Sequence, residues 1–343
     1  MKKNISIFFV SSSLQVLAAQ CIAENFDNDR ELILVLYKKN LDSIVKNNVW
    51  AKHFYMPWPR HDPDTGFFGV HRRLIKNLLL LDHIVDGCQS LYLYSAVYDT
   101  EAINYFVSFF QKKIGDSNFS ARILPDGIIS TQRNNLTFTK RILKKTRNLR
   151  YLFNRNLIYT HFTGDRIGSD AKFVDKIYVL NGMPHQYDAK KVTILPPLFK
   201  KSKNVAKTSL SNGLVIGQPL KGFKIMSQKN IYLTSTTISQ WLNEKQVSRI
   251  YYKKHPKDTL NTLNNEKYLI LPDELLIEEH LASNYFDYIV GVNSTVLLLA
   301  KQICSTNTNV ISFGINKINF KNKSDELATI KLFKDFNIQM KKI

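Results

Sequence analysis

The sequence predicts an α/β fold of two Rossmann-like domains, each built on a parallel sheet and facing the other across a central cleft. Short apolar runs rich in β-branched and aromatic residues alternate with helical patterns along the chain. Such alternation is typical of parallel sheets with right-handed crossovers. A segment rich in proline, lysine and serine separates two series of this kind, and 343 residues that are 44% hydrophobic suffice for two cores.

The first series predicts a domain over residues 1–195. The apolar run NISIFFV at residues 4–10 is expected to form its first strand, and a helical pattern follows from Leu14 to about Glu24. A basic stretch at residues 136–175 carries helical pieces. Further strand signals lie in RELILVLYKK (30–39), QSLYLYSAVYDTEAINYFVSFFQKKIG (89–115, continued by a helix), FSARILPDGIIS (119–130) and DKIYVLNG (175–182).

Residues 196–212 predict the linker between the domains, because two prolines are followed there by lysines and serines. The second series predicts a domain over residues 213–343 that ends in a basic helix, IKLFKDFNIQMKKI. Its strand signals lie in GLVIGQPLKG (213–222), VSRIYYKKHP (247–256), KYLILPDELLIEEHL (267–281, with a helix), FDYIVGVNSTVLLLAKQIC (286–304, with a helix) and NVISFG (309–314).

The charge of the chain favours an anionic partner. There are 48 Lys and Arg against 28 Asp and Glu, a formal net charge of +20. A nucleic acid, an anionic membrane surface or a charged small molecule fits that excess. The sequence has neither zinc-finger spacing nor the aromatic signature of RNA-binding domains, so nucleic acid is not expected as a partner. These features do not specify an oligomeric state.

The sequence also indicates where the protein acts. Serines at 11–13 interrupt the N-terminal apolar run, so a signal peptide is not expected, and no window has about 18 uninterrupted apolar residues. Cys21, Cys88 and Cys304 are far apart, which fits a reducing compartment. We expect a cytoplasmic protein, peripheral to the inner face of the cytoplasmic membrane. The basic segment at 330–343 either touches anionic lipid or packs back on its own domain.

Polar residues collect where the predicted strands end. Ligands of open α/β sheets bind at the carboxyl ends of the strands, near the point where strand order reverses. No zinc-binding cluster and no glycine-rich phosphate loop accompany them. The candidates at these strand ends are Ser11, Ser12, Ser13, Asp126, Gln218, His255, Glu274 and Ser294.

His255 lies in the stretch YYKKHPKD at residues 251–258, directly after a predicted strand. Pro256 keeps His255 out of the α region and so presents the imidazole in a defined direction. Lys253 and Lys254 add positive charge beside it, and a bound phosphate would favour the imidazolium form. The stretch is interpreted either as a phosphate site or as a solvated basic turn.

Two further strand ends allow two readings each. Ser294 and Thr295 open a predicted helix whose free N–H groups can bind an anion, although Ser294 also fits a simple N-cap. Glu274 is placed in the first turn of a helix that begins at Pro272 and Asp273. There its carboxylate accepts hydrogen bonds from a ribose diol or complements the helix dipole.

The first domain supplies acidic candidates. Asp126 and Gly127 end a strand, so Asp126 is either a general base or part of an ordinary Pro-Asp-Gly turn. Two acidic pairs, DND at 27–29 and DPD at 62–64, are of the kind that holds a divalent metal in many nucleotide-sugar enzymes. The first is expected in a loop away from the strand ends, and the second near the cleft.

An ordered set of short motifs resembles the bacterial sialyltransferases of the lipooligosaccharide, O-antigen and polysialic-acid type. That family carries a D/E-D/E-G motif in the N-terminal domain and an HP motif, a P-x-E segment and a Ser/Thr motif in the C-terminal domain. The resemblance spans most of the chain through VSSSLQVLAAQCIAEN (10–25), LPDG (124–127), IGQPL (216–220), KKHPKD (253–258), LPDELL (271–276) and VNSTVLL (292–298).

The resemblance implies a GT-B-like fold with residues 1–195 on the acceptor side and residues 213–343 binding CMP-sialic acid. It implies an inverting transfer of sialic acid to a sugar hydroxyl, with no required cofactor and no metal. The expected acceptor is a terminal galactoside of a bacterial surface glycan, an O-antigen or lipooligosaccharide that is lipid-linked, joined in an α2,3 linkage. A monophosphate leaving group suits histidine, hydroxyls and a helix N-terminus, since it carries less charge than a diphosphate.

The resemblance also assigns roles at the donor phosphate. His255, aimed by Pro256, would contact or protonate the CMP phosphate, with Lys253 or Lys254 nearby. Ser294 and Thr295 would bind the same phosphate.

Other roles concern the nucleoside and the acceptor. Glu274 would hold the cytidine ribose, Gly217 and Gln218 would line the nucleotide pocket, and Ser12 and Ser13 would contribute to donor binding. Asp126 would accept the proton of the acceptor hydroxyl.

One departure from the family pattern concerns the base, because Pro125 stands where the first acidic residue is expected. Either Asp126 takes the role, or Asp62, Asp64 or Asp99 does. Two other functions stay open at this stage. One is a GT-B transferase with another nucleotide-sugar donor, and the other is a non-catalytic protein that binds anions or glycans.

Overall fold

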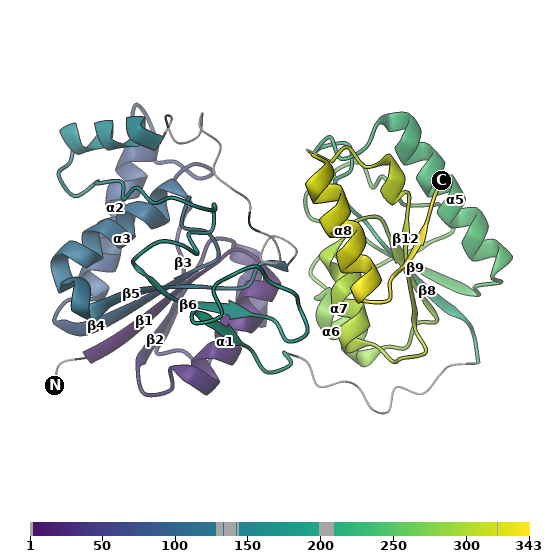
Figure 1. The fold of residues 1–343 in the computed structure, drawn as a ribbon, viewed down its shortest axis with the longest axis horizontal. Coiled ribbons are helices and arrows are strands. Elements are labelled where there is room, and N and C mark those ends of the chain that lie inside the picture. The colour runs from purple at the N-terminus through teal and green to yellow at the C-terminus, as the bar shows by residue number, and fades with distance from the viewer. Residues whose placement is uncertain (1–2, 128–132, 134–141, 143, 199–208, 321) are drawn as a thin grey trace. The chain divides into compact units, whose positions relative to one another are not determined.

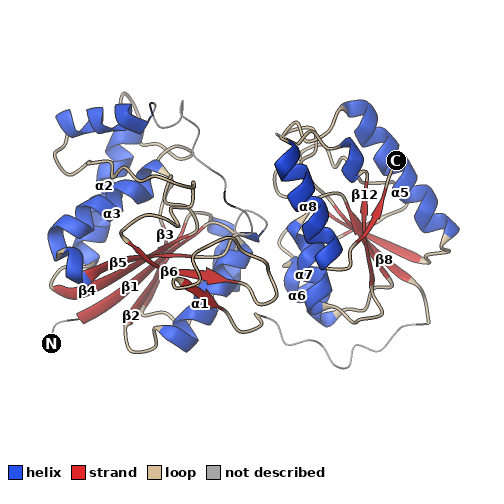
Figure 2. Ribbon diagram, viewed as in Figure 1, coloured by secondary structure: helices blue, strands red, loops and turns tan. Residues whose placement is uncertain are grey.

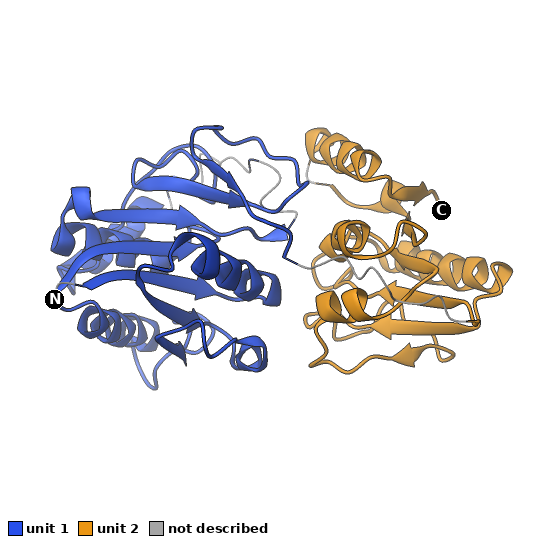
Figure 3. Ribbon diagram, turned by 90° about the horizontal axis from the view of Figure 1, so that it is seen from below, with its two compact units in different colours: residues 1–198 blue, residues 199–343 orange. Residues whose placement is uncertain are grey.

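The structure, a computed structural model, describes the whole chain except residues 1–2, 128–132, 134–141, 143, 199–208 and 321 (Figure 1). The chain divides into two compact units, Met1–Leu198 and Phe199–Ile343 (Figure 3). Most of the predicted linker at 196–212, and part of the basic stretch at 136–175, lie outside the described residues. Each unit is an α/β domain with a fully parallel sheet, as the sequence predicts.

Unit 1 contains a seven-stranded sheet in the order β3-β2-β1-β4-β5-β6-β7. All neighbouring strands run parallel, and the predicted first strand lies in the middle of the sheet. Strands buried on both faces need continuous apolar runs, which is why NISIFFV was recognisable in the sequence. The bounds are β1 Lys3–Val10, β2 Glu31–Leu36, β3 Lys52–Tyr55, β4 Cys88–Ser95, β5 Phe119–Ile123, β6 Val174–Val179 and β7 Val192–Ile194.

Helices cover both faces of this sheet. Helix α1 (Ser13–Phe26) lies on one face, and α2 (Gly69–Ile84) and α3 (Glu101–Ile114) lie on the other (Figures 1 and 2). The described residues of unit 1 also form the short 3₁₀ helices η1 (Lys39–Ile44), η2 (Asp116–Asn118) and η4 (Thr146–Leu152). Strand β3 and helix α2 were not expected from the sequence, because β3 has four residues and α2 follows a loop with several prolines and glycines.

A buried ion pair ties α1 to the sheet of unit 1. Asp27, 1% exposed, accepts hydrogen bonds from Ser6 Oγ at 2.5 Å and Tyr94 Oη at 2.7 Å. Arg122 Nη1 lies 3.2 Å from the same carboxylate, while Arg122 Nη2 lies 3.2 Å from Asp175. These groups come from four adjacent strands and the end of α1. The DND segment therefore has a structural role in this domain, away from the carboxyl ends of the strands.

Unit 2 contains a six-stranded parallel sheet in the order β10-β9-β8-β11-β12-β13. Helix α5 (Gln228–Glu244) covers one face, and α6 (Ile277–Ser283), α7 (Thr295–Ile303) and α8 (Lys323–Asp335) cover the other (Figure 1). A 3₁₀ helix, η5, spans Ile315–Lys317. The strands are β8 Asn212–Ile216, β9 Arg249–Lys253, β10 Leu269–Ile270, β11 Tyr288–Gly291, β12 Asn309–Phe313 and β13 Gln339–Lys341.

Two sequence expectations for unit 2 were wrong in detail. The terminal segment 330–343 is not one helix, because α8 ends at Asp335 and β13 then pairs with β12. Leu332 and Phe333 are buried, so the apolar side of this segment packs into the unit. Helix α6 begins at Ile277 rather than at Pro272, which leaves Glu274 in the turn between β10 and α6.

The strand orders fix where each sheet can receive a ligand. In unit 1 the order reverses between β1 and β4, and in unit 2 it reverses between β8 and β11. The loops that leave adjacent parallel strands in opposite directions open a crevice at their carboxyl ends. None of the helices in the described part of the chain combines the length and the apolar character needed to cross a bilayer.

Gly217 follows β8 at this crevice, and we predict that it tolerates no side chain. A Cβ there would lie 2.6 Å from Tyr252 Oη and 3.0 Å from the carbonyl oxygen of Lys253. Tyr252 is fully buried, so it has little room to move. Gly217→Ala should therefore lower the free energy of unfolding by about 1–3 kcal/mol, measured by urea denaturation.

Gly222→Ala is the matched control for this substitution. A Cβ at Gly222 meets no atom within 4 Å. Its stability should stay within about 0.5 kcal/mol of the unmodified protein. Equal stabilities of the two variants would show that the end of β8 is not tightly packed.

Candidate functional site

In unit 2, the side chain of Gln218 bridges the crevice between β8 and β11. Its Nε2 donates to the carbonyl oxygen of Asn293 at 2.7 Å, and its Oε1 accepts from the main-chain N–H of Asn293 at 3.0 Å. The main-chain oxygen of Gln218 accepts from Thr262 Oγ1 at 3.1 Å. Gln218 is 9% exposed, so it acts mainly as a brace that positions the loop before α7.

That loop delivers Ser294 and Thr295 to the N-terminus of α7. Ser294 is the N-cap, and its Oγ accepts from the N–H of Val296 at 3.3 Å. Its hydroxyl hydrogen remains able to donate, and the helix end adds a partial positive charge. Next to it, the buried Oδ1 of Asn293 has no hydrogen-bond partner among the described residues. An anion with a neighbouring hydroxyl donor would match this set of groups.

His255 follows β9 and is held by its own turn. The N–H of Lys257 donates to His255 Nδ1 at 3.0 Å, and the N–H of Asp258 donates to the carbonyl oxygen of His255 at 2.8 Å. A nitrogen that accepts a hydrogen bond carries no proton, so the neutral ring presents its hydrogen on Nε2. The turn thereby fixes the orientation of the imidazole ring.

The two lysines beside His255 have different surroundings. Lys253 is 9% exposed, and its Nζ donates to the carbonyl oxygens of Pro272 at 2.6 Å and Asp273 at 3.0 Å. Burial lowers the pKa of Lys253, although nearby carboxylates, including Glu274, oppose that shift. Lys253 therefore holds the loop that carries the exposed Glu274. Lys254, with Nζ 3.9 Å from Asp273 Oδ2, is less restrained.

Gly217 directly follows β8, a strand that pairs with β9. Its N–H donates to the carbonyl oxygen of Lys253 at 2.8 Å. The structure thus places the candidate residues of unit 2 at the carboxyl edge of one sheet, at the end of β9, on the loops after β8, β9, β10 and β11, and at the first residue of α7. Pro256 lies exposed in the same turn as His255.

The candidates of unit 1 follow β1 and β5. Ser12 is the N-cap of α1, accepting from Gln15 N at 3.3 Å, and Ser13 is the first residue of that helix. Pro125 is buried and Asp126 half-buried, and Gly127 adopts the left-handed region at φ 60° that a side chain would disfavour. The turn after β5 therefore needs its glycine.

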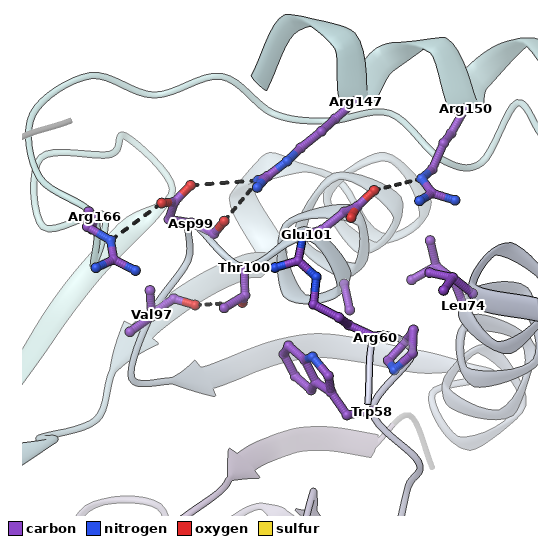
Figure 4. A pocket seen from close by; sticks show the side chains of 13 residues that line it. Trp58, Arg60, Leu74, Val97, Asp99, Thr100, Glu101, Arg147, Arg150 and Arg166 are labelled. Atoms are coloured by element: carbon purple, nitrogen blue, oxygen red, sulfur yellow. Dashed lines mark hydrogen bonds and ion pairs between the residues drawn. The ribbon is translucent and has the colours of Figure 1, made fainter. Parts of the chain in front are cut away.

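A cationic pocket, which the sequence analysis did not identify, lies at the carboxyl ends of β3 and β4. It has a volume of about 380 Å³. Arg60, Arg147, Arg150 and Arg166 line it together with Asp99 and Glu101 (Figure 4). Arg150 Nε donates to Glu101 at 2.6 Å, whereas no ion pair of Arg60 is found among the described residues. The arginines outnumber the two carboxylates, so the pocket suits an acidic ligand.

Asp99 is the anchor of this pocket. Lys144 Nζ lies 2.5 Å from its carboxylate, and the guanidinium groups of Arg147 and Arg166 each lie 3.7 Å away (Figure 4 shows the two arginines). Tyr159 Oη donates to it at 3.3 Å. These contacts occupy the carboxylate of Asp99, which therefore joins the cationic side chains of the pocket to one another.

The DPD segment offers no better base. Lys76 Nζ lies 2.6 Å from Asp64, and its hydrogen bond lowers the pKa of that carboxyl group. Asp62 accepts from Tyr55 Oη at 3.1 Å. In the described part of the chain, no group of three or more His, Cys, Asp or Glu is arranged to hold a metal ion.

The sequence carried one signal for the cationic pocket. Arginines cluster between residues 122 and 166, in a chain whose cations are otherwise mostly lysine. Arginine is the preferred partner of carboxylates because its guanidinium binds them through two hydrogen bonds. A comparison of arginine with lysine along the sequence would have pointed to this region.

Comparison with known families gives one match. The model of the family described as alpha-2,8-polysialyltransferase (POLYST) matches residues 137–312. The matched range contains all the candidate residues of unit 2, from Gly217 to Thr295, and the three arginines of the pocket that follow residue 137. No curated protein matches the chain.

Solved structures show the same fold at low sequence identity. CalG4, the calicheamicin glycosyltransferase, is 9% identical over 99% of this chain and 86% of its own, with a TM-score of 0.53. The UDP-GlcNAc 2-epimerase of Methanocaldococcus jannaschii is 12% identical over 97% of this chain and 92% of its own, with a TM-score of 0.50. The UDP-GlcNAc 2-epimerase of Neisseria meningitidis is 9% identical over 97% of this chain and 90% of its own, with a TM-score of 0.51. The chain has the GT-B fold that the sequence predicts.

Gln218→Ala tests the brace at the unit 2 crevice. We predict a loss of about 1–3 kcal/mol in the free energy of unfolding, because the main-chain groups of Asn293 lose both partners. Nucleotide binding, measured by calorimetric titration with CMP, should weaken as well.

Gln218→Glu and Gln240→Ala are the controls. Glutamate at 218 can accept from Asn293 N–H but cannot donate to its carbonyl oxygen, so an intermediate effect is expected. Gln240, on α5, should be neutral. Unchanged CMP binding in Gln218→Ala would separate the brace from the site.

Proposed function

The chain belongs to the alpha-2,8-polysialyltransferase family, and on this premise we propose that it transfers sialic acid from CMP-sialic acid to an acceptor glycan. It is a sialyltransferase-type glycosyltransferase with a GT-B fold. The observation that carries the choice of donor is the arrangement at the unit 2 crevice. His255, Ser294 and the N-terminus of α7 offer hydrogen-bond donors at the same edge of the sheet, and the oxygens of a phosphate are the acceptors that suit such donors.

We assign the donor contacts as follows. His255 donates from Nε2 to the phosphate of CMP, and Ser294, Thr295 and the α7 N-terminus share that anion. Lys254 supplies nearby charge, while Lys253 and Gln218 act indirectly by positioning the loops. Glu274, held near the crevice by the bonds of Lys253 to its loop, accepts from the ribose hydroxyls.

The chemistry asks two things of these groups. The bond between the sialyl carbon and the phosphate oxygen breaks, so negative charge grows on the phosphate that His255 and α7 contact. The acceptor hydroxyl attacks from the opposite face and gives its proton to a base, which inverts the configuration. We propose Asp126 as this base, because it follows β5 at the carboxyl edge of the unit 1 sheet and directly precedes the glycine of the family's D/E-D/E-G motif.

The cationic pocket supports an acidic acceptor. Four arginines suit the carboxylate of a terminal sialic acid. The family description, alpha-2,8-polysialyltransferase, supports sialic acid as the acceptor residue. The terminal galactoside of a lipid-linked surface glycan, joined by an α2,3 linkage, is the alternative acceptor. A neutral galactoside has no carboxylate that could bind the arginines of the pocket.

We predict that His255→Ala lowers the turnover number about 10²–10³-fold while the free energy of unfolding stays unchanged, because one donor to the leaving phosphate is lost. The turnover number is measured as the rate at which CMP is released from CMP-sialic acid. His255→Gln, whose side-chain N–H can replace Nε2–H, should recover part of the rate, and His83→Ala on unit 1 is the matched control.

A donor screen accompanies that measurement. If UDP-sugars or CDP-sugars are turned over and CMP-sialic acid is not, the donor assignment is wrong. If no nucleotide is released with any acceptor and CMP fails to raise the unfolding temperature, the protein is a non-catalytic binder.

Arg60→Ala separates the two acceptors. With a sialylated acceptor the KM should rise about 10-fold or more, because a hydrogen bond to a charged group is lost. With a galactoside acceptor the KM should not change. The control Arg249→Ala in unit 2 should leave the KM for the sialylated acceptor and the KM for the galactoside unchanged. Turnover of galactosides alone, indifferent to Arg60, would exclude the sialylated acceptor.

A further inference from the structure

Unit 1 exposes an unusual group of large apolar side chains. Phe67 is 91% exposed, Leu152 76%, Phe68 and Phe153 each 74%, and Leu149 59%. We call these five residues the exposed apolar patch. Single exposed apolar residues are normal on protein surfaces, but a contiguous group of this kind marks an interaction site.

The patch joins two segments that are far apart in the sequence. Phe67 and Phe68 precede α2, and the other three residues lie on or next to η4. The rings of Phe68 and Phe153 are 6.3 Å apart, and the ring of His71 lies 6.1 Å from that of Phe153. The two segments therefore form one surface.

Phe68 occupies a costly conformation to reach this surface. Its φ is 60° and its ψ is 25°, the left-handed region that bulky residues avoid, and it has Gly69 as its neighbour. Glycine at 68 would remove the strain and the exposed ring together. A strained, outward-facing phenylalanine is best explained by a partner that binds the ring.

The two segments that carry the patch are rich in cations. Residues 66–76 contain Arg72, Arg73 and Lys76 and no acidic residue, and residues 144–155 contain five Lys and Arg and no acidic residue. Arg72 and Lys76 are in part neutralised by Asp64. Lys145 and Arg155 are exposed, and no ion pair of either is found among the described residues.

We propose that the exposed apolar patch and its basic rim dock unit 1 on an anionic lipid bilayer. Phenylalanine and leucine side chains enter the boundary between headgroups and acyl chains, while lysine and arginine remain at the anionic headgroups. A protein partner would need acidic groups around an apolar centre, which is a more specific requirement than a surface of anionic lipid. The proposal does not depend on the donor or the acceptor of the transfer reaction.

Element η4 connects this surface with the cationic pocket. Arg147 and Arg150 line the pocket, whereas Leu149 and Leu152 on the same short helix are exposed. Docking through η4 would hold the pocket close to the headgroups, where the glycan of a lipid-linked acceptor begins. The C-terminal segment is a weaker candidate for lipid contact, because Leu332, Phe333 and Ile338 are buried.

Vesicle co-sedimentation of the full chain tests the proposal. One set of vesicles contains phosphatidylcholine alone, and the other contains phosphatidylcholine with phosphatidylglycerol. The unmodified protein should bind the anionic vesicles at low salt and bind the neutral ones weakly. The triple variant Phe67→Ser, Leu152→Ser, Phe153→Ser should bind the anionic vesicles at least about tenfold more weakly, because three inserted side chains are lost.

A control triple variant removes three exposed large side chains from unit 2, namely Tyr232→Ser, Leu260→Ser and Leu327→Ser. It should bind anionic vesicles like the unmodified protein. Lys145→Glu with Arg155→Glu should weaken binding to anionic vesicles and leave binding to neutral ones unchanged. Thermal unfolding and CMP release with a water-soluble acceptor should be the same in all variants.

Equal vesicle binding by the patch variant and the unit 2 variant would overturn the proposal. The proposal would also be overturned if sedimentation velocity showed that the patch substitutions convert an oligomer to monomer while vesicle binding persists. Loss of CMP release in the unmodified protein would affect the proposed reaction only, since vesicle binding needs no substrate.

Discussion

The two hydrogen bonds between the Gln218 side chain and the main chain of Asn293 hold the candidate donor site together. They join the loops after β8 and β11, where the strand order of unit 2 reverses. The position of the α7 N-terminus, and with it Ser294 and Thr295, depends on this brace. Beyond the ends of β8 and β11 the two chain segments diverge, so the main-chain N–H and carbonyl of Asn293 find no partner in the sheet. The side-chain amide of Gln218 has one donor and one acceptor side and satisfies both of these groups.

Positive charge serves two purposes in this protein. Lys253 and Arg122 are buried and use their donors within the fold, Lys253 on loop carbonyls and Arg122 on Asp27 and Asp175. Cations at the rims stay accessible, as in the arginines of the unit 1 pocket and the residues around the exposed apolar patch. The net charge of +20 therefore overstates the positive charge that ligands can reach. The positions of the individual cations say more about binding than their sum does.

Loops on the carboxyl side of both sheets carry the chemistry, while the sheets provide rigid supports. His255 shows how a local turn sets a chemical property. The N–H of Lys257 occupies Nδ1, so the ring offers a donor at Nε2 without needing a charge of its own. In the proposed reaction this donor would face the negative charge that grows on the leaving phosphate.

The sequence by itself determined most of the buried strands, several of the helices after them and the ordered motifs at their ends, because buried parallel strands need apolar runs and their exits need turn chemistry. It did not identify α2, α5, β3, β7 or β13, and it placed the start of α6 five residues too early. Only the tertiary structure decided that Lys253 points at carbonyls, that four arginines meet in one pocket and that Phe68 and Phe153 share a surface. The reason is physical: a side chain's direction and partners depend on strand order and on segments distant in the chain, which local patterns do not encode.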